Sequence, residues 1–483
     1  MRLGKTSVVH FLSSLIASAA GFLATIYIAR ILGAEPLGVY NLVVGLVSWL
    51  AIAGRVGISK AIIKRVSEGT EPGAYTIAGV SIIAVLFLVL TAGIVLFRSQ
   101  VVNYVGYPAT GFIVLILLAV LLNGLVNALL MGFHLVHVSG ILSPIRTGSR
   151  TMAQIALVAV GASTMGLFVG HIVGFSIAIL IGAYYVFRNI PELSRPGQRH
   201  FESLANFAKF SWLGSLQSKM FSYTDVLILG VFVSSGLIGV YAVAWNIAEF
   251  LILFSSTLQS TLFPEMSAIS AEEDPQAVAR IVEQSLSFGG LFLIPGLFGG
   301  ALLGERILRL YGPEFPKGAT ILTLLIVANL FMGYQNQLLN ALNAIDRPDL
   351  AFRVNIVFVG ANIVLNLGLI YLYGWVGAAV ATTASVVISL VFAYRNINAI
   401  IDFDVPMREI GRQWFAAVIM ALLVYGGLYV ENTYRLLGHN AIVLFVLVIA
   451  GAGMYFLTLL SISTEFRETV DRNLPVSLPF VSR

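Results

Sequence analysis

Long apolar runs separated by short polar breaks follow one another along nearly the whole chain. A helix needs about 20 apolar residues to cross the hydrocarbon core of a bilayer, and fourteen runs reach helix length. The breaks between them carry turn or charge signals, such as Glu71-Pro72-Gly73 and Asp346-Arg347-Pro348. The runs are approximately 8–32, 37–58, 74–97, 110–133, 141–163, 166–187, 207–233, 237–263, 284–304, 318–345, 351–372, 375–394, 411–430 and 440–461. This pattern predicts an all-α integral membrane protein with about 14 transmembrane helices. The first run follows Arg2 and Lys5 like a signal peptide, but it continues to Leu32 and is therefore interpreted as a spanning helix.

The composition excludes several classes of protein. Of the 483 residues 58% are hydrophobic and only 11% are charged, whereas soluble domains carry about 25% charged residues. A soluble enzyme, a nucleic-acid-binding domain and a disordered chain are therefore excluded. The chain has no cysteine, which removes disulfides, thiol catalysis and thiolate metal sites.

The basic residues predict an orientation. If the N-terminus is cytoplasmic and the fourteen spans alternate, six of the 28 basic residues fall outside: Arg30, Arg98, Arg306, Arg309, Lys317 and Arg435. Arg55 and Lys219 lie within spans, and the other 20, which include Arg146 and Arg150, lie on the cytoplasmic side. This excess obeys the positive-inside rule and accounts for the net charge of +5 without a nucleic-acid partner. We therefore expect a multi-pass protein of the plasma membrane of a prokaryote, with both termini cytoplasmic.

The two halves of the chain resemble each other at a nearly constant offset. Gly38-Val39-Tyr40 matches Gly239-Val240-Tyr241, and Asn127-Ala128-Leu129-Leu130 matches Asn336-Gln337-Leu338-Leu339. Six spans separate the copies, so both have the same orientation, which is the parallel-repeat design of some transporters. The predicted parts are an N-lobe over 1–188, a cytoplasmic linker over 189–206, a C-lobe over 207–400, and two further helices with a short tail over 401–483. Such a duplication predicts a site between the lobes that opens alternately to each side; a duplicated scaffold without transport is the structural alternative.

Polar residues within the spans are the candidates for that site, because a charge at the bilayer centre costs about 2.5–3.5 kcal/mol. In the seventh run Ser211, Ser215, Ser218, Ser222 and Asp225 form one helix face, flanked by Lys219. The candidates for substrate binding are Lys219, Arg55, Arg30, Ser215, Ser218 and Ser222, and those for ion coupling are Asp225 and Glu249. Each also has a structural interpretation. Lys219 and Asp225 can neutralise partners, while Arg55 can belong to a cytoplasmic basic cluster and Arg30 can reach the outer interface.

Other polar and small residues are interpreted as packing positions. Asn355, Asn362 and Asn366 share a face and are typical of helix–helix hydrogen bonds. The pairs Gly170 with Gly174 and Gly296 with Gly300 have the spacing of close helix packing.

Signatures of catalysis are missing. The sequence has no G-x-x-x-x-G-K-[ST] loop for ATP and neither an H-E-x-x-H nor a G-x-S-x-G motif. We therefore predict a transporter without cofactor or metal, driven by an ion gradient, the membrane potential or the gradient of its substrate.

Several segments resemble one family of membrane proteins. Residues 29–40, with Ala29, Arg30, Gly33, Gly38 and Tyr40, look like the "A-R-x-L-G-x-x-x-x-G-x-Y" start of polysaccharide-export flippases. Segments 225–230, 239–241, 310–315 and 374–379 resemble later signatures of these flippases in the same order. The chain thus resembles the O-antigen flippase-like branch of the multidrug/oligosaccharidyl-lipid/polysaccharide exporter superfamily. The resemblance implies a V-shaped, MATE-like pair of six-helix lobes and a cationic cavity. It also implies transfer of a polyprenyl-linked glycan from the cytoplasmic to the outer leaflet.

The leading hypothesis is therefore a lipid-linked sugar flippase whose partners are its glycan substrate, membrane lipids and Na⁺ or H⁺, with no ATP, and for which a monomer suffices. A cation-coupled multidrug exporter on the same scaffold would use Asp225 and Glu249, but Arg30, Arg55 and Lys219 would repel a cationic drug. A membrane glycosyltransferase is a third hypothesis. Glu272-Glu273-Asp274 is the only acidic cluster that could hold its metal, and it reads as a helix start.

Overall fold

The computed structural model describes residues 21–55, 57–190, 192–271 and 275–473. Over these residues the chain consists of helices joined by short connections and contains no strand. The helices fall into two compact units, whose boundary lies between Ala242 and Val243. The fold class predicted from the apolar runs is thereby confirmed.

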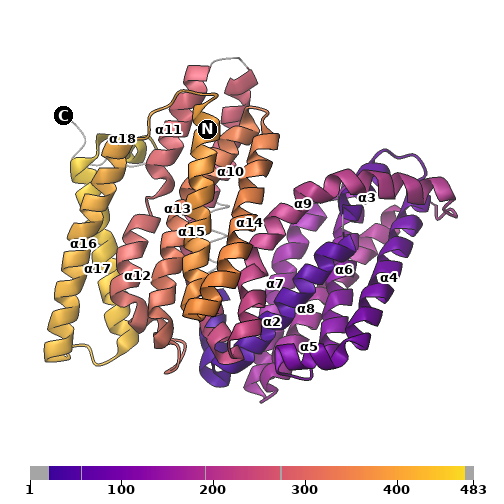
Figure 1. The fold of residues 1–483 in the computed structure, drawn as a ribbon, viewed down its shortest axis with the longest axis horizontal. Helices are drawn as coiled ribbons and strands as arrows, with labels where there is room; N and C mark the ends of the chain where they lie inside the picture. The colour runs from indigo at the N-terminus through magenta and orange to yellow at the C-terminus, as the bar shows by residue number, and fades with distance from the viewer. Residues whose placement is uncertain (1–20, 56, 191, 272–274, 474–483) are drawn as a thin grey trace. The chain divides into compact units, whose positions relative to one another are not determined.

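The N-terminal unit, Ser13–Ala242, is built around α6. Its helices are Gly21–Leu32, α2 (Ala34–Arg55), α3 (Ile58–Ser67), α4 (Pro72–Leu96), α5 (Arg98–Val105), α6 (Thr110–Gly132), α7 (Val136–Ala159), α8 (Ser163–Asn189), α9 (Gln198–Phe232) and the start of α10 (Ser235–Ala271). α6 contacts α2, α3, α4 and α8 (Figure 1). It buries Ile113, Ile116, Leu117 and Leu121 completely, so α6 lies in the core of this unit.

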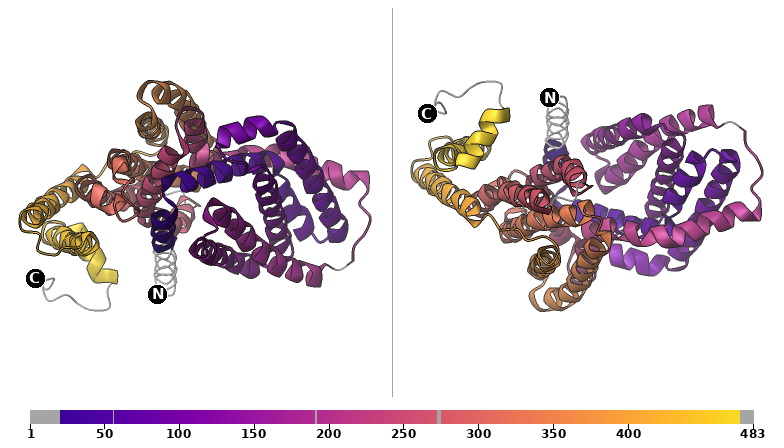
Figure 2. Two further views of the ribbon diagram at one scale, coloured as in Figure 1. Left: turned by 90° about the horizontal axis from the view of Figure 1, so that it is seen from below. Right: turned by 90° about the horizontal axis from the view of Figure 1, so that it is seen from above.

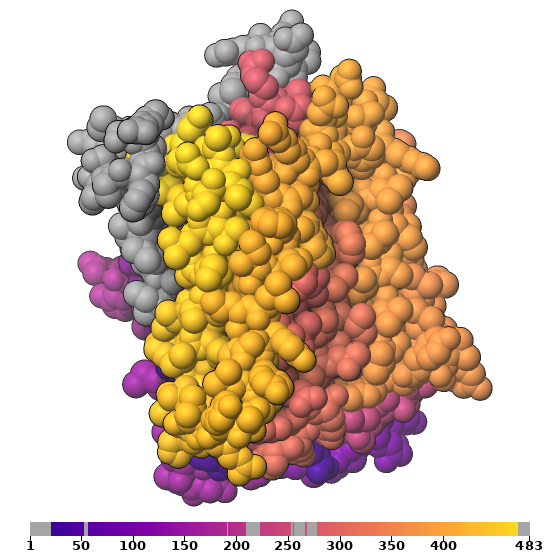
Figure 3. Space-filling model, turned by 90° about the vertical axis from the view of Figure 1, so that its left-hand side faces the viewer, coloured from indigo at the N-terminus to yellow at the C-terminus, as the bar shows by residue number. Residues whose placement is uncertain are grey.

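The C-terminal unit comprises the helices from Val243 onward. They are the rest of α10, α11 (Pro275–Gly289), α12 (Leu293–Leu308), η1 (Pro316–Gly318), α13 (Ala319–Ala344), α14 (Pro348–Tyr373), α15 (Trp375–Asn398), α16 (Met407–Tyr434), α17 (Asn440–Ile462) and α18 (Thr464–Asn473). α13 contacts α11, α12, α14 and α15. These helices run side by side in Figure 1 and are foreshortened in Figure 2. α16 and α17 pack on α12 and cover one face of the unit (Figure 3).

The predicted spans correspond to helices of the structure. Within the described ranges, eleven helices are long and apolar enough to cross a membrane, and two shorter apolar helices, Gly21–Leu32 and Tyr223–Phe232, lie within the first and seventh predicted runs. The fifth run corresponds to α7, which lies antiparallel along the spanning helix α8, since Leu157 faces Gly166 and Leu142 faces Gly182. We therefore treat α7 as a membrane-crossing helix as well.

The fifth predicted run, 141–163, misses the start of α7 by five residues. α7 begins at Val136, directly after a turn in which His134 has a φ of 60°, and ends at Ala159. Polar residues in its first turn, such as His137 and Ser139, hid this start from a search for apolar runs. As a result Arg146 and Arg150 lie in the middle third of the helix.

Equivalent positions of the two predicted copies meet in a reciprocal contact between α2 and the start of α10. A Cβ atom on Gly38 would overlap the carbonyl oxygen of Ser235, and one on Gly239 would overlap that of Ala34. Gly38 and Ala34 of the first copy are equivalent to Gly239 and Ser235 of the second, so each contact is the counterpart of the other. A pair of elements related by a two-fold axis has this property. The two glycines thus let the equivalent helices cross at the distance of backbone contact.

The small residues of α8 confirm one predicted packing motif. A Cβ on Gly170 would lie 2.7 Å from the backbone nitrogen of Gln154, and one on Gly174 would lie 2.7 Å from the Cα of Arg150. The backbone of α7 therefore approaches α8 along this glycine face. Gly296 and Gly300 instead accommodate the side chains of Leu251 and Ile326.

Asn362, one of the three predicted asparagines, bridges two helices. The side chain of Asn362 on α14 donates to the Thr382 hydroxyl on α15 at 3.3 Å, as expected for a hydrogen bond that joins helices. Asn355 instead donates to the Ala351 carbonyl of its own helix at 2.8 Å.

Candidate functional site

The structure describes the predicted substrate-binding residues only in part. Arg30 lies near the end of the helix Gly21–Leu32 with an exposed side chain. Arg55 is the last residue of α2, and Lys219 lies on α9. The side chains of Arg55 and Lys219, and those of Ser211, Ser215, Ser218 and Ser222, are outside the described part of the chain. Their roles therefore stay predictions.

The two acidic candidates lie in different surroundings. Asp225 on α9 is 7% exposed and accepts a hydrogen bond from the Tyr241 hydroxyl at 2.8 Å. Glu249 on α10 has an exposed side chain, which is hydrogen-bonded to Trp245 one turn earlier. Asp225 is thus held inside the N-terminal unit by a side chain from the first turns of α10.

Tyr241 and its counterpart in the first copy play parallel roles. The hydroxyl of Tyr40 on α2 lies 2.8 Å from Nδ1 of His171 on α8. His171 is 3% exposed. Each copy therefore uses the tyrosine of its Gly-Val-Tyr sequence to hold a buried titratable group, which is an imidazole in the first copy and a carboxylate in the second.

A basic cluster between α7 and α8 was missed by the sequence analysis. It consists of Arg146 and Arg150 on α7 and His171 on α8, and we call it the α7–α8 basic cluster. The guanidinium of Arg146 lies 5.1 Å from the centre of the Phe175 ring, which in turn stacks on the His171 ring at 4.7 Å. Two signals could have revealed the cluster: the spacing of four between the arginines, and the lack of any Asp or Glu between Pro72 and Pro191.

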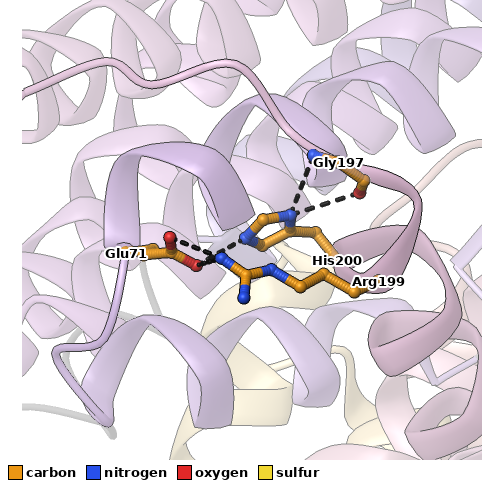
Figure 4. Close-up of polar contacts among 4 residues, drawn as sticks. All are labelled: Glu71, Gly197, Arg199 and His200. Carbon is orange, nitrogen blue, oxygen red and sulfur yellow. Dashed lines mark hydrogen bonds and ion pairs between the residues drawn. The ribbon is translucent and has the colours of Figure 1, made fainter.

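A second polar cluster joins the start of α9 to the turn before α4 (Figure 4). The carboxylate of Glu71 contacts the Arg199 guanidinium at 2.6 Å and Nε2 of His200 at 2.9 Å. The backbone N–H of Gly197 donates to Nδ1 of His200 at 3.0 Å. In the neutral imidazole that accepts this bond, Nε2 carries the hydrogen and donates it to Glu71. We call these contacts the Glu71–His200 clasp.

The clasp predicts a dependence of stability on pH. Hydrogen bonding to His200, followed by the charge of Arg199, lowers the pKa of the Glu71 carboxyl below its ordinary value of 4.5. A carboxyl with a lowered pKa in the folded protein stabilises the fold above its ordinary pKa, and this contribution is lost as the pH falls through the lowered value. Below pH 4.5 the melting temperature of the wild type should therefore fall more steeply than that of Glu71→Gln, as measured by thermal unfolding in detergent. Equal slopes would exclude this role, and Glu68→Gln, which removes a charge outside the clasp, is the control.

A third cluster joins the last helices of the C-terminal unit. Glu409 on α16 is 5% exposed, contacts the Arg412 guanidinium at 2.7 Å and accepts a hydrogen bond from Ser463, which follows α17. Gln413, which follows Arg412 in α16, donates to the Ser287 carbonyl of α11 at 2.5 Å. Two α16 residues thus connect α16 to α11 and to the turn between α17 and α18.

A family comparison identifies the chain. The family described as "Polysaccharide biosynthesis protein" matches residues 27–315, which is more than half of the 483 residues. The chain belongs to this family. The match includes α2, α7, α8 and α9, and therefore the basic cluster, the clasp and Asp225 of this polysaccharide biosynthesis protein.

Two relatives match over the full length. The "Probable flippase AglR" of Haloferax volcanii is 33% identical, and the alignment covers 99% of each chain. The "Probable low-salt glycan biosynthesis flippase Agl15" of the same organism is 27% identical over 98% of this protein and 99% of that one. These relatives confirm the branch of the exporter superfamily to which the sequence was assigned.

Solved structures share the fold of this polysaccharide biosynthesis protein. The "Lipid II flippase MurJ" matches with a TM-score of 0.78 and 15% identity, over 96% of this chain and all of that chain. A multidrug resistance MATE family transporter matches with a TM-score of 0.61 and 13% identity, over 79% of this chain and 95% of the other. The expected MATE-like helical fold is confirmed.

Proposed function

We propose that this protein moves a lipid-linked sugar or oligosaccharide, carried on a polyprenyl phosphate or diphosphate, from the cytoplasmic to the outer leaflet. The product would serve synthesis of a surface polysaccharide or glycoprotein. The observation that carries the proposal is the full-length similarity to two proteins named as probable flippases. The all-helical fold, which the MurJ structure shares, supports transport rather than catalysis.

The proposed mechanism keeps the polyprenyl tail in lipid while the protein carries the polar head across the membrane. An unpaired ion taken out of water costs several kcal/mol, so basic side chains must accompany the phosphate. Lys219, Arg55 and Arg30 are proposed for this role, and Ser215, Ser218 and Ser222 for the sugar hydroxyls. A membrane potential that is negative inside favours the outward step by about 2.3 kcal/mol per charge per 100 mV. Asp225 and Glu249 are proposed to couple the step to Na⁺ or H⁺.

Removal of Lys219 tests the mechanism. Because the ammonium group offsets the desolvation of the phosphate, Lys219→Ala should lower transfer by about tenfold or more, the factor that corresponds to about 1.4 kcal/mol. The measurement is restoration of surface glycan in a prokaryotic strain that lacks its own flippase, at equal protein levels in the membrane. Lys317→Ala, which removes an exposed lysine from η1, is the matched control.

The same assay separates the proposal from drug export. If the wild-type protein does not restore the glycan but confers resistance to cationic dyes, it is a multidrug exporter with the fold of the MATE transporters. If Lys219→Ala transfers glycan normally, Lys219 has no part in the mechanism.

A further inference from the structure

The face of α7 that packs on α8 is interrupted by two positive charges. Val138, Leu142, Arg146, Arg150, Gln154 and Val158 follow one another at intervals of four, and every member except the two arginines is buried. The arginines are half-buried. Gly174 faces the backbone of both, so α8 determines where they lie. Two residues of the same charge at this spacing repel each other, and charged side chains within spanning helices are rare.

Among the residues that the structure describes, no acidic side chain pairs with these arginines. The sequence contains no Asp or Glu from Pro72 to Pro191, a stretch that includes α4, α6, α7 and α8. Across the described residues neither Arg146 nor Arg150 has an acidic partner within ion-pair distance. The arginines lie in the middle third of α7, where a charge costs about 2.5–3.5 kcal/mol. A pair of guanidinium groups without an acidic partner in the described part of the chain is suited to bind an anionic ligand.

The hydrogen-bonding groups of the cluster are mostly unused. Nε of Arg150 and Nε2 of His171 are buried without a hydrogen-bond partner among the described residues. The Arg146 guanidinium has one long contact, 3.4 Å to the Ser143 hydroxyl. In the tautomer in which Tyr40 donates to Nδ1 of His171, Nε2 carries a hydrogen and is a third donor. The cluster therefore offers donors and positive charge to a ligand that supplies acceptors and negative charge.

We propose that the α7–α8 basic cluster binds an oxyanion of the translocated glycolipid while its head is between the two leaflets. The proposal rests on the proposed function, because the ligand is the cargo of the flippase. Planar guanidinium groups bind phosphate and carboxylate oxygens in pairs, so both the phosphate of the carrier lipid and an acidic sugar have the required chemistry. Phe175 positions Arg146 by contact with its guanidinium face.

Ligand-dependent thermal stabilisation of the purified protein tests the site directly. Farnesyl phosphate should raise the melting temperature of the wild type, whereas farnesol, which has the same chain without the charge, should not. Each of Arg146→Gln and Arg150→Gln should weaken the apparent affinity by about tenfold, since hydrogen bonds to charged groups contribute this much. Arg188→Gln is the matched control. Arg188 also lies over an aromatic ring, Tyr184 at 5.8 Å, but it is exposed at the end of α8.

A second ligand identifies the source of the oxyanion, and a variant that keeps both charges controls for misfolding. If glucuronic acid rather than farnesyl phosphate stabilises the wild type through both arginines, the ligand is an acidic sugar and the site stands. The double variant Arg146→Lys with Arg150→Lys keeps the charges, so it should retain part of the response that the glutamine variants lose. If no anion stabilises the wild type, or if the glutamine variants respond like it, the proposal is overturned.

The binding assay and the glycan assay fail independently. A wild-type protein that binds farnesyl phosphate through Arg146 and Arg150 but does not restore surface glycan would contradict the proposed function and leave the anion site in place. If the wild type restores surface glycan and the glutamine variants restore it equally well, the proposed function stands and the proposed anion site is contradicted.

Discussion

Replacing Gly38 by valine should lower the melting temperature of the purified protein sharply and reduce the yield of monodisperse protein. Its Cβ would overlap the Ser235 carbonyl oxygen and lie 2.9 Å from the backbone nitrogen of Gly239. Backbone atoms of a packed helix cannot turn away as a flexible side chain can, so α2 and α10 would have to separate. The expected cost is at the upper end of the about 1–3 kcal/mol typical of overpacking, and differential scanning fluorimetry in detergent measures it.

The reciprocal geometry supplies a second test of the same contact. Gly239→Val should destabilise the protein to a similar degree, because its Cβ would overlap the Ala34 carbonyl oxygen. Gly236→Val is the control, since a Cβ on Gly236, also in α10, would have no neighbour within 4 Å. Wild-type stability in Gly38→Val, or equal loss in the control, would show that the crossing is looser than described.

Truncation of Glu409 should be the most destabilising change in the last helices of the C-terminal unit. Glu409→Ala removes the partner of Arg412, whose side chain is only 22% exposed, and the acceptor of the Ser463 hydroxyl. Loss of one member of a buried ion pair costs about 3–5 kcal/mol. Because Arg412 is partly exposed, we expect the lower end of this range in thermal unfolding.

A double-mutant cycle separates the ion pair from the rest of the effect. Glu409→Ala combined with Arg412→Ala should be less destabilised than the sum of the single variants, because it leaves no unpaired charge. Additive losses would mean that the pair contributes nothing beyond the packing of its side chains. Arg408→Ala, an exposed neighbour on α16, should have little effect.

The helices of this protein could be predicted because their lengths follow from the thickness of the bilayer. Runs such as 110–133 and 440–461 agree with α6 and α17 to within one residue at each end. The duplication was also readable, because Gly38 and Gly239 are required by the same close contact. The start of α7 was not readable, because polar residues such as His137 and Ser139 stand in its first turn and the apolar run begins only after them.

The candidate site was harder to predict, because its contacts join residues far apart in the chain. Glu71 and His200 are separated by 129 positions, and no local pattern links them. Asp225 was singled out by its depth in a span, yet its bond to Tyr241 depends on how α9 and α10 pack. The sequence contains Arg146 and Arg150, but only the structure shows that they lie on the face of α7 that packs on α8.

The crossing of α2 with α10 also bears on how such a protein arose. Because each glycine accepts the backbone of the other copy, a single ancestral half could have formed the same contact with a second molecule of itself. Fusion of two genes would then have joined partners that already fitted each other. In the present chain the Tyr40 hydroxyl contacts an imidazole and the Tyr241 hydroxyl contacts a carboxylate. The two copies thus hold different titratable groups while they keep the same backbone contact.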